Sequence, residues 1–276
     1  MYPILVILGL ALIVLAALRL WDERADRLEW ARLATSQPAS PALYDPVIVA
    51  GLPEPAQRFF NFAIAPDTPL LNVAEIDMEG EFSLGTQENP NYRPMDARQI
   101  LAAPLGFVWK AKMSGAVPMS GSDTGSWTRF RIFDLIPVAR MGGVPDHTRA
   151  AYGRYVAEAV FWTPAALLPG PGVVWEALGQ DTARVTVSYN GLSQSVDLQV
   201  DAEGRPVVVQ FMRWSNANPE KKHQLQPFGG ILSDFREVQG FRVPFKVEAA
   251  NMFGTDQHFV FFRATITDVR FLSPMS

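Results

Sequence analysis

Apolar and polar residues alternate with a period of two through most of the chain after residue 73. Residues 74–84 carry an apolar side chain at nearly every other position, and 241–248 alternate Phe and Val with polar residues and Pro244. Because successive side chains on a strand point to opposite faces, this pattern predicts strands with one buried face. About eleven such segments occur without helices between them, which favours an antiparallel sheet. Pro244 predicts that its strand lies at an edge of that sheet.

A row of carboxylates at alternate positions of 75–81 raises the question of a calcium site. Basic residues alternate in two neighbouring predicted strands, with Lys110 and Lys112 in one and Arg129 and Arg131 in the other. Pairs of opposite charge across strands stabilise a solvated sheet face, whereas calcium ligands converge at a loop or turn. We therefore expect a solvated, charge-compensated outer face and no metal site.

Two segments of the body have helical periodicity instead. Residues 52–64 repeat apolar side chains at helical spacing, with Phe59 and Phe60 predicted to enter a core. Residues 146–163 form a second predicted helix, which ends before Pro164. The predicted fold is therefore mainly β within the α+β class: a curved antiparallel sheet or half-barrel of about eleven strands, two covering helices and one N-terminal transmembrane helix.

The transmembrane prediction rests on residues 2–20, which carry no charge before Arg19. At ~1.5 Å per residue this run is about 28 Å long, enough to span a bilayer. Tyr2 and Trp21 flank it, as aromatic residues do at the headgroup level. A cleaved signal peptide is the alternative, but the run has no basic region before it and no A-x-A site at its end. We therefore predict an uncleaved anchor.

The rest of the N-terminal region divides the chain. The helix is expected to continue to about Ala34, and the Pro- and Ser-rich segment that follows has the composition of a linker. This predicts an anchor at 1–21, a juxtamembrane helix and linker at 22–51, and a single β-rich soluble domain at 52–276. Arginines follow the apolar run but none precede it, so the positive-inside rule places the body in the cytoplasm.

Composition and motifs exclude several classes of function. The chain has no Cys, so it has no disulfide, thiolate metal site or Cys nucleophile. Its net charge is −4 and its basic residues are scattered, which argues against nucleic-acid binding. The three histidines lack metal-ligand spacing, and no nucleophile elbow, Walker loop or dinucleotide fingerprint is present. We predict no cofactor, metal or catalytic residue. A hydrolase that pairs distant carboxylates, such as Asp134 and Glu158, stays an alternative.

The candidate ligand-binding residues come from an ion pair and from the aromatic side chains. Glu158 lies at the edge of an aromatic arc on the second predicted helix, where it would orient the polar head of a ligand. The alternative is an ordinary surface pair with Arg154. The tryptophans either fill a core or line an apolar cavity inside the curved sheet. The predicted ligand-binding residues are Trp109, Tyr152, Arg154, Tyr155, Glu158, Trp162 and Trp175.

The segment GRYVAEAVFWTPAALLPGPGVVWEA at 153–177 resembles an uncharacterised bacterial family of membrane-anchored domains with a GRYLAEAVWLPTALLP-like signature. Three further pieces are similar to that family: LPEPAQRFFNFAI, PLGFVWKAKM, and DAEGRPVVVQ followed by GFRVPFKVEA. Together the matches extend over residues 52–272. The family has no assigned activity, so this resemblance implies a fold and an anchor but no reaction.

The closing part of the chain resembles a second group. The order D-x-x-G-R, a strand, VQGFRVP and a final strand ending in ITDVRF is similar to the half-barrels of bacterial lipoprotein-carrier and lipoprotein-sorting proteins. The resemblance implies antiparallel strands curled around helices that cover an apolar cavity for acyl chains. It also implies a periplasmic body, against the arginine count.

The resulting functional hypothesis is a non-enzymatic domain held in the bacterial inner membrane by residues 2–21. It would bind a lipid or another hydrophobic molecule in a cavity lined by the aromatic arc. An accessory subunit that docks on a membrane protein complex is the first alternative. A carboxylate-dependent hydrolase is the second.

Overall fold

In the computed structural model, which describes residues 2–218 and 220–274, thirteen strands form one antiparallel sheet. The first six are β1 Ala74–Ser83, β2 Tyr92–Ala102, β3 Gly106–Met113, β4 Met119–Thr124, β5 Trp127–Ile132 and β6 Ile136–Gly142. The other seven are β7 Val173–Ala177, β8 Thr182–Tyr189, β9 Leu192–Val200, β10 Pro206–Ser215, β11 Gln224–Val238, β12 Phe241–Asn251 and β13 Phe259–Phe271. The predicted antiparallel β class is confirmed.

The sheet consists of two meanders joined at the middle. Strands β1 to β6 follow one another outwards, β7 to β13 follow one another inwards, and β1 pairs with β13 to close the order. The count exceeds the expected eleven because some strands lack alternation. The sequence of β4 is MSGSDT, with one apolar residue, although β4 pairs with β3 and β5 on its two sides.

The predicted edge position of Pro244 is wrong. Its strand β12 lies between β11 and β13 inside the sheet. Pro244 pairs with Phe235 of β11, whereas the register with β13 begins only at Lys246. The proline therefore occupies a stretch of β12 that pairs with β11 but not with β13, which relaxes the constraint that excludes proline from central strands.

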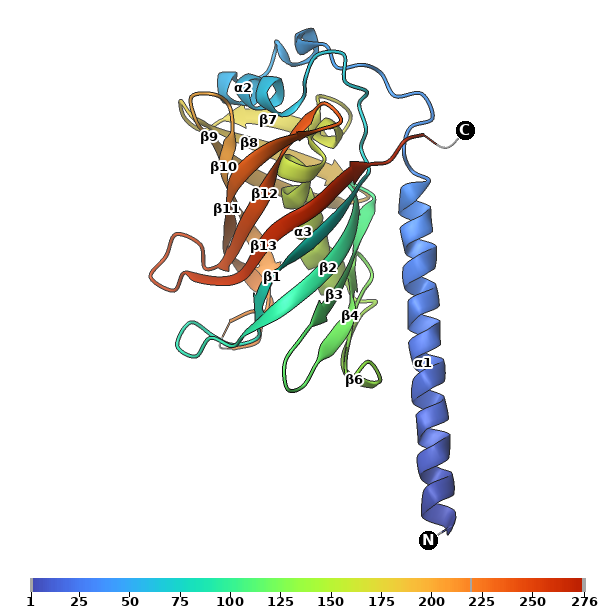
Figure 1. Cartoon of the computed structure of the whole chain (residues 1–276). Coiled ribbons are helices and arrows are strands. Elements are labelled where there is room, and N and C mark those ends of the chain that lie inside the picture. The colour runs from blue at the N-terminus through green and yellow to red at the C-terminus, as the bar shows by residue number, and fades with distance from the viewer. Residues whose placement is uncertain (1, 219, 275–276) are drawn as a thin grey trace.

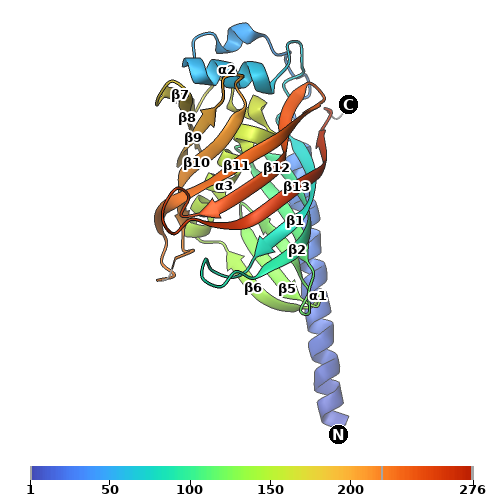
Figure 2. The ribbon, with the colours of Figure 1, turned by 60° about the vertical axis from the view of Figure 1, so that its left-hand side comes forward.

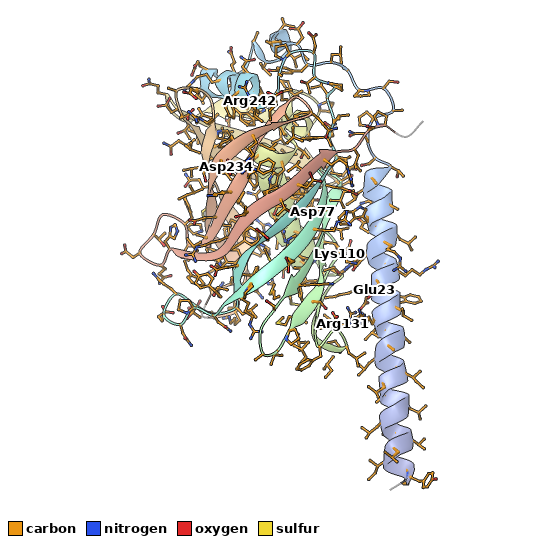
Figure 3. The ribbon with its side chains drawn as sticks, viewed as in Figure 1. Glu23, Asp77, Lys110, Arg131, Asp234 and Arg242 are labelled. Atoms are coloured by element: carbon orange, nitrogen blue, oxygen red, sulfur yellow. The ribbon has the colours of Figure 1, made fainter. Side chains whose placement is uncertain are left out.

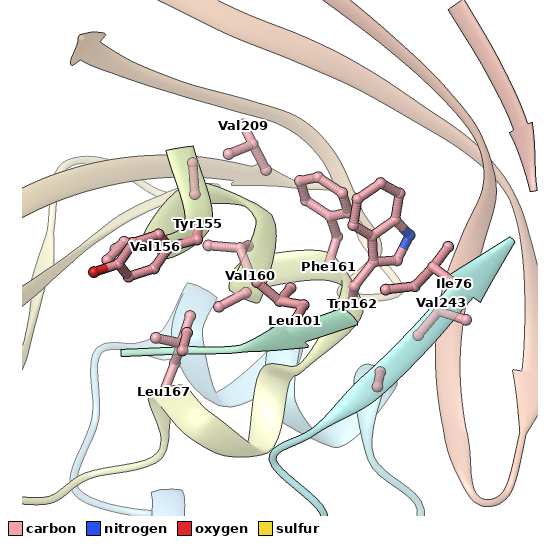
Figure 4. Close-up of a cluster of buried hydrophobic side chains, with 14 of the residues drawn as sticks. Ile76, Leu101, Tyr155, Val156, Val160, Phe161, Trp162, Leu167, Val209 and Val243 are labelled. Carbon is pink, nitrogen blue, oxygen red and sulfur yellow. The ribbon is translucent and has the colours of Figure 1, made fainter. Parts of the chain in front are cut away.

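The sheet curls around helix α3, Pro145–Trp162, as Figures 1 and 2 show. Figure 4 shows Val156, Val160 and Phe161 of α3 among side chains of the surrounding strands, including Val209. These residues are buried and belong to the main core, as the aromatic arc on this helix predicts. Helix α3 therefore fills part of the concave side of the sheet.

Helix α2, Glu54–Ala63, closes one end of the curved sheet, together with the short 3-10 helices η1, Pro46–Val49, and η2, Pro164–Leu167. The rings of Phe59 and Phe60 are fully buried, as predicted. Their centroids lie 5.9 and 5.3 Å from that of Trp175 on β7. This end of the body is therefore a packed aromatic plug.

Helix α1, Tyr2–Ala34, stands beside the body, and its N-terminal part extends well beyond it (Figure 1). Among the described residues, it is the one helix long and apolar enough to cross a membrane. Its second half packs on the convex face of the sheet. Leu33 there is fully buried in a small second core with Val73, Ile100 and Val108. The predicted juxtamembrane helix is thus packed against the sheet.

The convex face is not the solvated surface that its charge rows predict. Arg129 and Arg131 form ion pairs with α1. Three of the four carboxylates of β1 pair with bases from the directly neighbouring strands, Arg98 of β2 and Arg263 and Arg270 of β13. The charge of β1 is compensated in part, but by other bases than the predicted rows, whose members Lys110, Arg129 and Arg131 pair with α1 instead.

Candidate functional site

A cavity of about 370 Å³ lies between α3 and the concave face of the sheet. Most of its lining side chains are aromatic or aliphatic, and they come from α3 and from both meanders. Four lining residues are charged: Asp123, Arg154, Glu158 and Arg213. The curved sheet therefore encloses space as well as a core, which is the geometry of a site for a hydrophobic ligand.

Arg154 is the centre of a saturated polar cluster in the wall of this cavity. Its Nε donates to Glu158 Oε1 at 2.7 Å, and its two terminal nitrogens donate to Asp123 Oδ2 at 2.8 Å and Gln99 Oε1 at 3.1 Å. Gln99 Nε2 donates in turn to Glu158 Oε2 at 2.6 Å. Burial alone lowers the pKa of Arg154, but the two carboxylates outweigh it and the pKa is raised. Arg154 is therefore a fixed cation whose charge is already compensated.

Arg213 of β10 lines the same cavity and is in the opposite situation. Within residues 2–218 and 220–274, its side chain has no hydrogen-bond or ion-pair partner, and its Nε is buried. Its guanidinium carbon lies 4.7 Å from the centroid of the Phe228 ring. Burial, together with the nearby charge of Arg154, lowers its pKa to about 10. Arg213 thus offers donors without an acceptor, and an oxygen-bearing head group would supply one.

The structure places four of the seven predicted ligand-binding residues at the cavity: Trp109, Arg154, Glu158 and Trp162. The ion pair is not an exposed surface pair, since the Arg154 and Glu158 side chains are only 19% and 15% exposed. This geometry agrees with the predicted position of Glu158 beside an aromatic arc.

The other three predicted residues lie in the packed core, outside the cavity lining. The Tyr152 hydroxyl donates to the carbonyl of Val187 at 3.0 Å, and Trp175 Nε1 donates to the carbonyl of Leu167 at 2.9 Å. Tyr155 packs against Tyr152, with ring centroids 5.3 Å apart. Their hydrogen bonds and ring contacts stabilise the packed core.

Sequence reasoning missed Gln99, Asp123 and Arg213. The alternation that places Val209 and Phe211 on the inner face continues to Arg213, so its inward position was available from the sequence. Asp123 could not be found this way, because β4 has no apolar alternation. Its position opposite Trp109 follows from the register of β4 with β3.

A second charged cluster joins α1 to the convex face. Asp22 of α1 is 1% exposed and forms ion pairs with Arg129, Arg131 and Arg140 of β5 and β6. Its pair with Arg129 measures 3.1 Å. Figure 3 shows Arg131 on the side of the sheet that faces α1. One carboxylate thus neutralises part of a cluster of three guanidinium groups.

One turn along α1, Asp26 makes a second set of contacts with the sheet. Its Oδ1 accepts from Ser122 Oγ at 2.8 Å and from Trp127 Nε1 at 3.2 Å, and its Oδ2 lies 3.6 Å from Lys110 Nζ. Trp30 Nε1 then donates to Glu75 Oε1 at 2.7 Å. Successive turns of one face of α1 are therefore bonded to the sheet.

A polar cavity of about 640 Å³ lies beside this interface, on the convex side. Asp134 lines it, whereas Glu158 lines the concave cavity, so the two carboxylates of the hydrolase hypothesis are on opposite faces of the sheet. In the part of the chain that the structure describes, no group of three or more His, Asp or Glu side chains is arranged to hold a metal ion. The pairing of Asp134 with Glu158 that the hydrolase hypothesis names is therefore not formed.

Fold and site together define a half-barrel with an internal apolar cavity, built on a helix that is long enough to span a membrane. The chain belongs to a family of unknown function, DUF6544, whose model matches residues 44–264. No curated protein matches the chain.

Several solved structures are similar at low identity. A LolA superfamily protein from Nitrosomonas europaea has a TM-score of 0.42 at 9% identity, covering 78% of this chain and 91% of that chain. A domain named for outer membrane lipoprotein sorting, from Vibrio parahaemolyticus, has a TM-score of 0.39 at 11% identity, covering 74% and 87%. A DUF1329 family protein from Desulfovibrio piger has a TM-score of 0.35 at 8% identity, covering 75% and 88%.

Proposed function

We propose that this protein is a membrane-tethered binding domain for an amphiphilic lipid, with no catalytic role. The observation that carries the proposal is the concave cavity, whose volume of about 370 Å³ is within the range of small-molecule sites, roughly 300–1,000 Å³. An apolar lining with a few charged groups on one wall suits a molecule with a hydrocarbon chain and a polar head.

The charged wall supports the amphiphile over a purely apolar ligand. Arg154 is held by Asp123, Glu158 and Gln99, so it forms a rigid polar surface. The donors of Arg213 have no hydrogen-bond acceptor among the described residues. A carboxylate, phosphate or ester oxygen at Arg213 would replace the missing acceptor, and the chain would lie among the aromatic rings.

The tether is the N-terminal half of α1. Its side chains from Tyr2 to Val14 are almost all exposed, as is expected of an apolar helix whose side chains contact lipid rather than protein. We assign it to the bacterial inner membrane as a single span. Reporter fusions at the C-terminus test on which side of the membrane the body lies. We expect the periplasmic side, from the sequence resemblance.

Lipid retention by the purified protein tests the proposal. The full chain, extracted from its host in mild detergent, is expected to carry lipid in native mass spectrometry and to bind a dansyl-labelled fatty acid. Ala157→Phe places a ring inside the cavity and is expected to abolish both, because Ala157 lines it. Ala31→Phe, on the exposed face of α1, is the matched control. An empty wild-type protein, or an Ala157→Phe variant that binds like the control, would overturn the proposal.

A further inference from the structure

The end of the apolar run in α1 lies beside the tip of the β5–β6 hairpin. Arg19, the first charged residue of the chain, is 4.0 Å from Asp134, which lies in the turn between these strands. Because Asp22 and Asp26 bond the next turns of α1 to the sheet, this position is fixed rather than incidental. A membrane spanned by residues 2–20 would therefore begin at the level of this hairpin.

Three connections lie at this same end of the sheet. The β1–β2, β3–β4 and β5–β6 connections are brought together by the strand register and by a bond from Phe133 N to the carbonyl of Pro118, 3.0 Å long. Figures 1 and 2 show these connections on the side towards the N-terminus of α1. Four exposed apolar side chains lie in these connections or at the adjoining start of β6, and we call them the rim: Leu84, Val117, Phe133 and Ile136.

The rim combines large hydrophobic side chains with high solvent exposure. Phe133 is 55% exposed and Ile136 46% exposed, although both are large hydrophobic side chains at the tip of a hairpin. The left-handed backbone of Phe133, with φ of 52°, adds strain that a bulky residue rarely carries. Exposed apolar side chains at the predicted membrane level are typical of a surface that enters the interface.

The concave cavity reaches the same end of the body. Its lining includes Met113 and Met119, at the ends of β3 and β4, and Leu84, which is at once in the lining and 40% exposed. The other end is closed by the plug of Phe59, Phe60 and Trp175. The cavity therefore approaches the surface on the side of the membrane.

We propose that the rim contacts the lipid bilayer that α1 spans, and that lipid passes directly between this bilayer and the cavity. The inference rests on the proposed function and adds the route of entry. The partner that the rim contacts is a bilayer surface. The ion pairs and hydrogen bonds of α1 fix the apolar segment relative to the rim, so a bilayer spanned by that segment would hold the rim at its interface continuously.

The absence of Cys makes the contact directly measurable. Phe133→Cys and Val47→Cys each give a single labelling site; Val47 is 69% exposed and lies in η1 at the plugged end. With an environment-sensitive fluorophore on the full chain in phosphatidylcholine–phosphatidylglycerol vesicles, the label at 133 is expected to emit at shorter wavelength and to be quenched by nitroxide-labelled lipid. The label at 47 is expected to be quenched by aqueous iodide. Iodide quenching of both labels alike would overturn the proposal.

A transfer experiment separates this inference from the binding function. In the double variant Phe133→Asp, Ile136→Asp, the extraction rate of the dansyl fatty acid from the protein's own vesicle is expected to fall about tenfold. Its affinity for the same probe supplied from detergent solution is expected to stay unchanged, and Val47→Asp should match the wild type in both assays. A protein that binds no probe contradicts the proposed function. A double variant that binds and extracts like the wild type contradicts only the entry route.

Discussion

Asp22 is a charged contact through which helix α1 docks on the sheet, and its removal tests how strongly the helix is held. It is 1% exposed and faces Arg129, Arg131 and Arg140. Burial, and then the nearby charge of Arg140, lower the pKa values of Arg129 and Arg131, so the guanidinium groups are already crowded. Asp22→Asn removes the carboxylate that forms ion pairs with all three.

The magnitude follows from the burial of the cluster. Removing one partner of a buried ion pair costs about 3–5 kcal/mol, because the charge left behind is unpaired. At about 1.4 kcal/mol per factor of ten, the docking equilibrium of α1 on the sheet should weaken by roughly two to three and a half orders of magnitude. Asp26, Trp30 and Leu33 still hold the far turns, so the body itself is expected to stay folded.

Amide hydrogen exchange on the full chain in nanodiscs measures this docking. We expect protection of the amides at 21–34 to fall in Asp22→Asn by up to that factor, limited by the turns that stay bonded, while protection in β8 to β12 is unchanged. Glu23→Gln is the matched control, since its pair with Arg19 is partly exposed and such pairs contribute about 0–1 kcal/mol.

Adding Arg131→Met to Asp22→Asn should restore part of the protection, because it removes one of the unpaired cations. Equal protection of 21–34 in Asp22→Asn and Glu23→Gln would refute the reasoning that this cluster clamps the helix.

Three further predictions concern the cavity and the turns. The pKa of Arg213 in the folded protein is lowered to about 10. Its charged form therefore destabilises the folded protein at every pH below about 10, and this cost falls only as the pH rises from about 10 towards the pKa of Arg213 in the unfolded chain. At pH 7, Arg213→Met should therefore stabilise the lipid-free protein by about 1–3 kcal/mol in urea unfolding and weaken binding of the dansyl fatty acid about tenfold; a loss of stability would contradict this. Glu158→Gln should cost about 1–3 kcal/mol, because Arg154 loses one of its two carboxylates; an unchanged urea midpoint would show that the cluster is not tightly coupled. Gly240→Ala should cost about 2–4 kcal/mol, since φ is +85° and the new Cβ would lie 2.2 Å from Thr68 Oγ1, whereas Gly254→Ala, at φ +75° with open space, should cost only about 1 kcal/mol; equal costs would exclude the clash.

Local periodicity predicted the elements well, because it depends only on neighbours along the chain. The alternation at 241–248 belongs to β12, and the aromatic arc at 152–162 faces the core from α3. The spacing of Arg154 and Glu158 placed both on one side of a helix, and the structure brings them together at 2.7 Å. Arg213 follows from the same rule once the strand is extended two residues past Phe211.

What the sequence by itself determined is therefore the class of fold, the length and apolar character of α1, and the side of each strand or helix that is apolar. The tertiary structure alone decided what covers each polar face. The arginines of β5 and β6 could pair with carboxylates of neighbouring strands, yet Arg131 forms its ion pair with Asp22, 109 residues earlier in the chain. The alternation in a strand predicts which face is charged, but it does not predict which oppositely charged residues will pair with that face. Only the packing of α1 on the convex face selects Asp22, because a local strand pattern carries no information on which distant segment will lie against it.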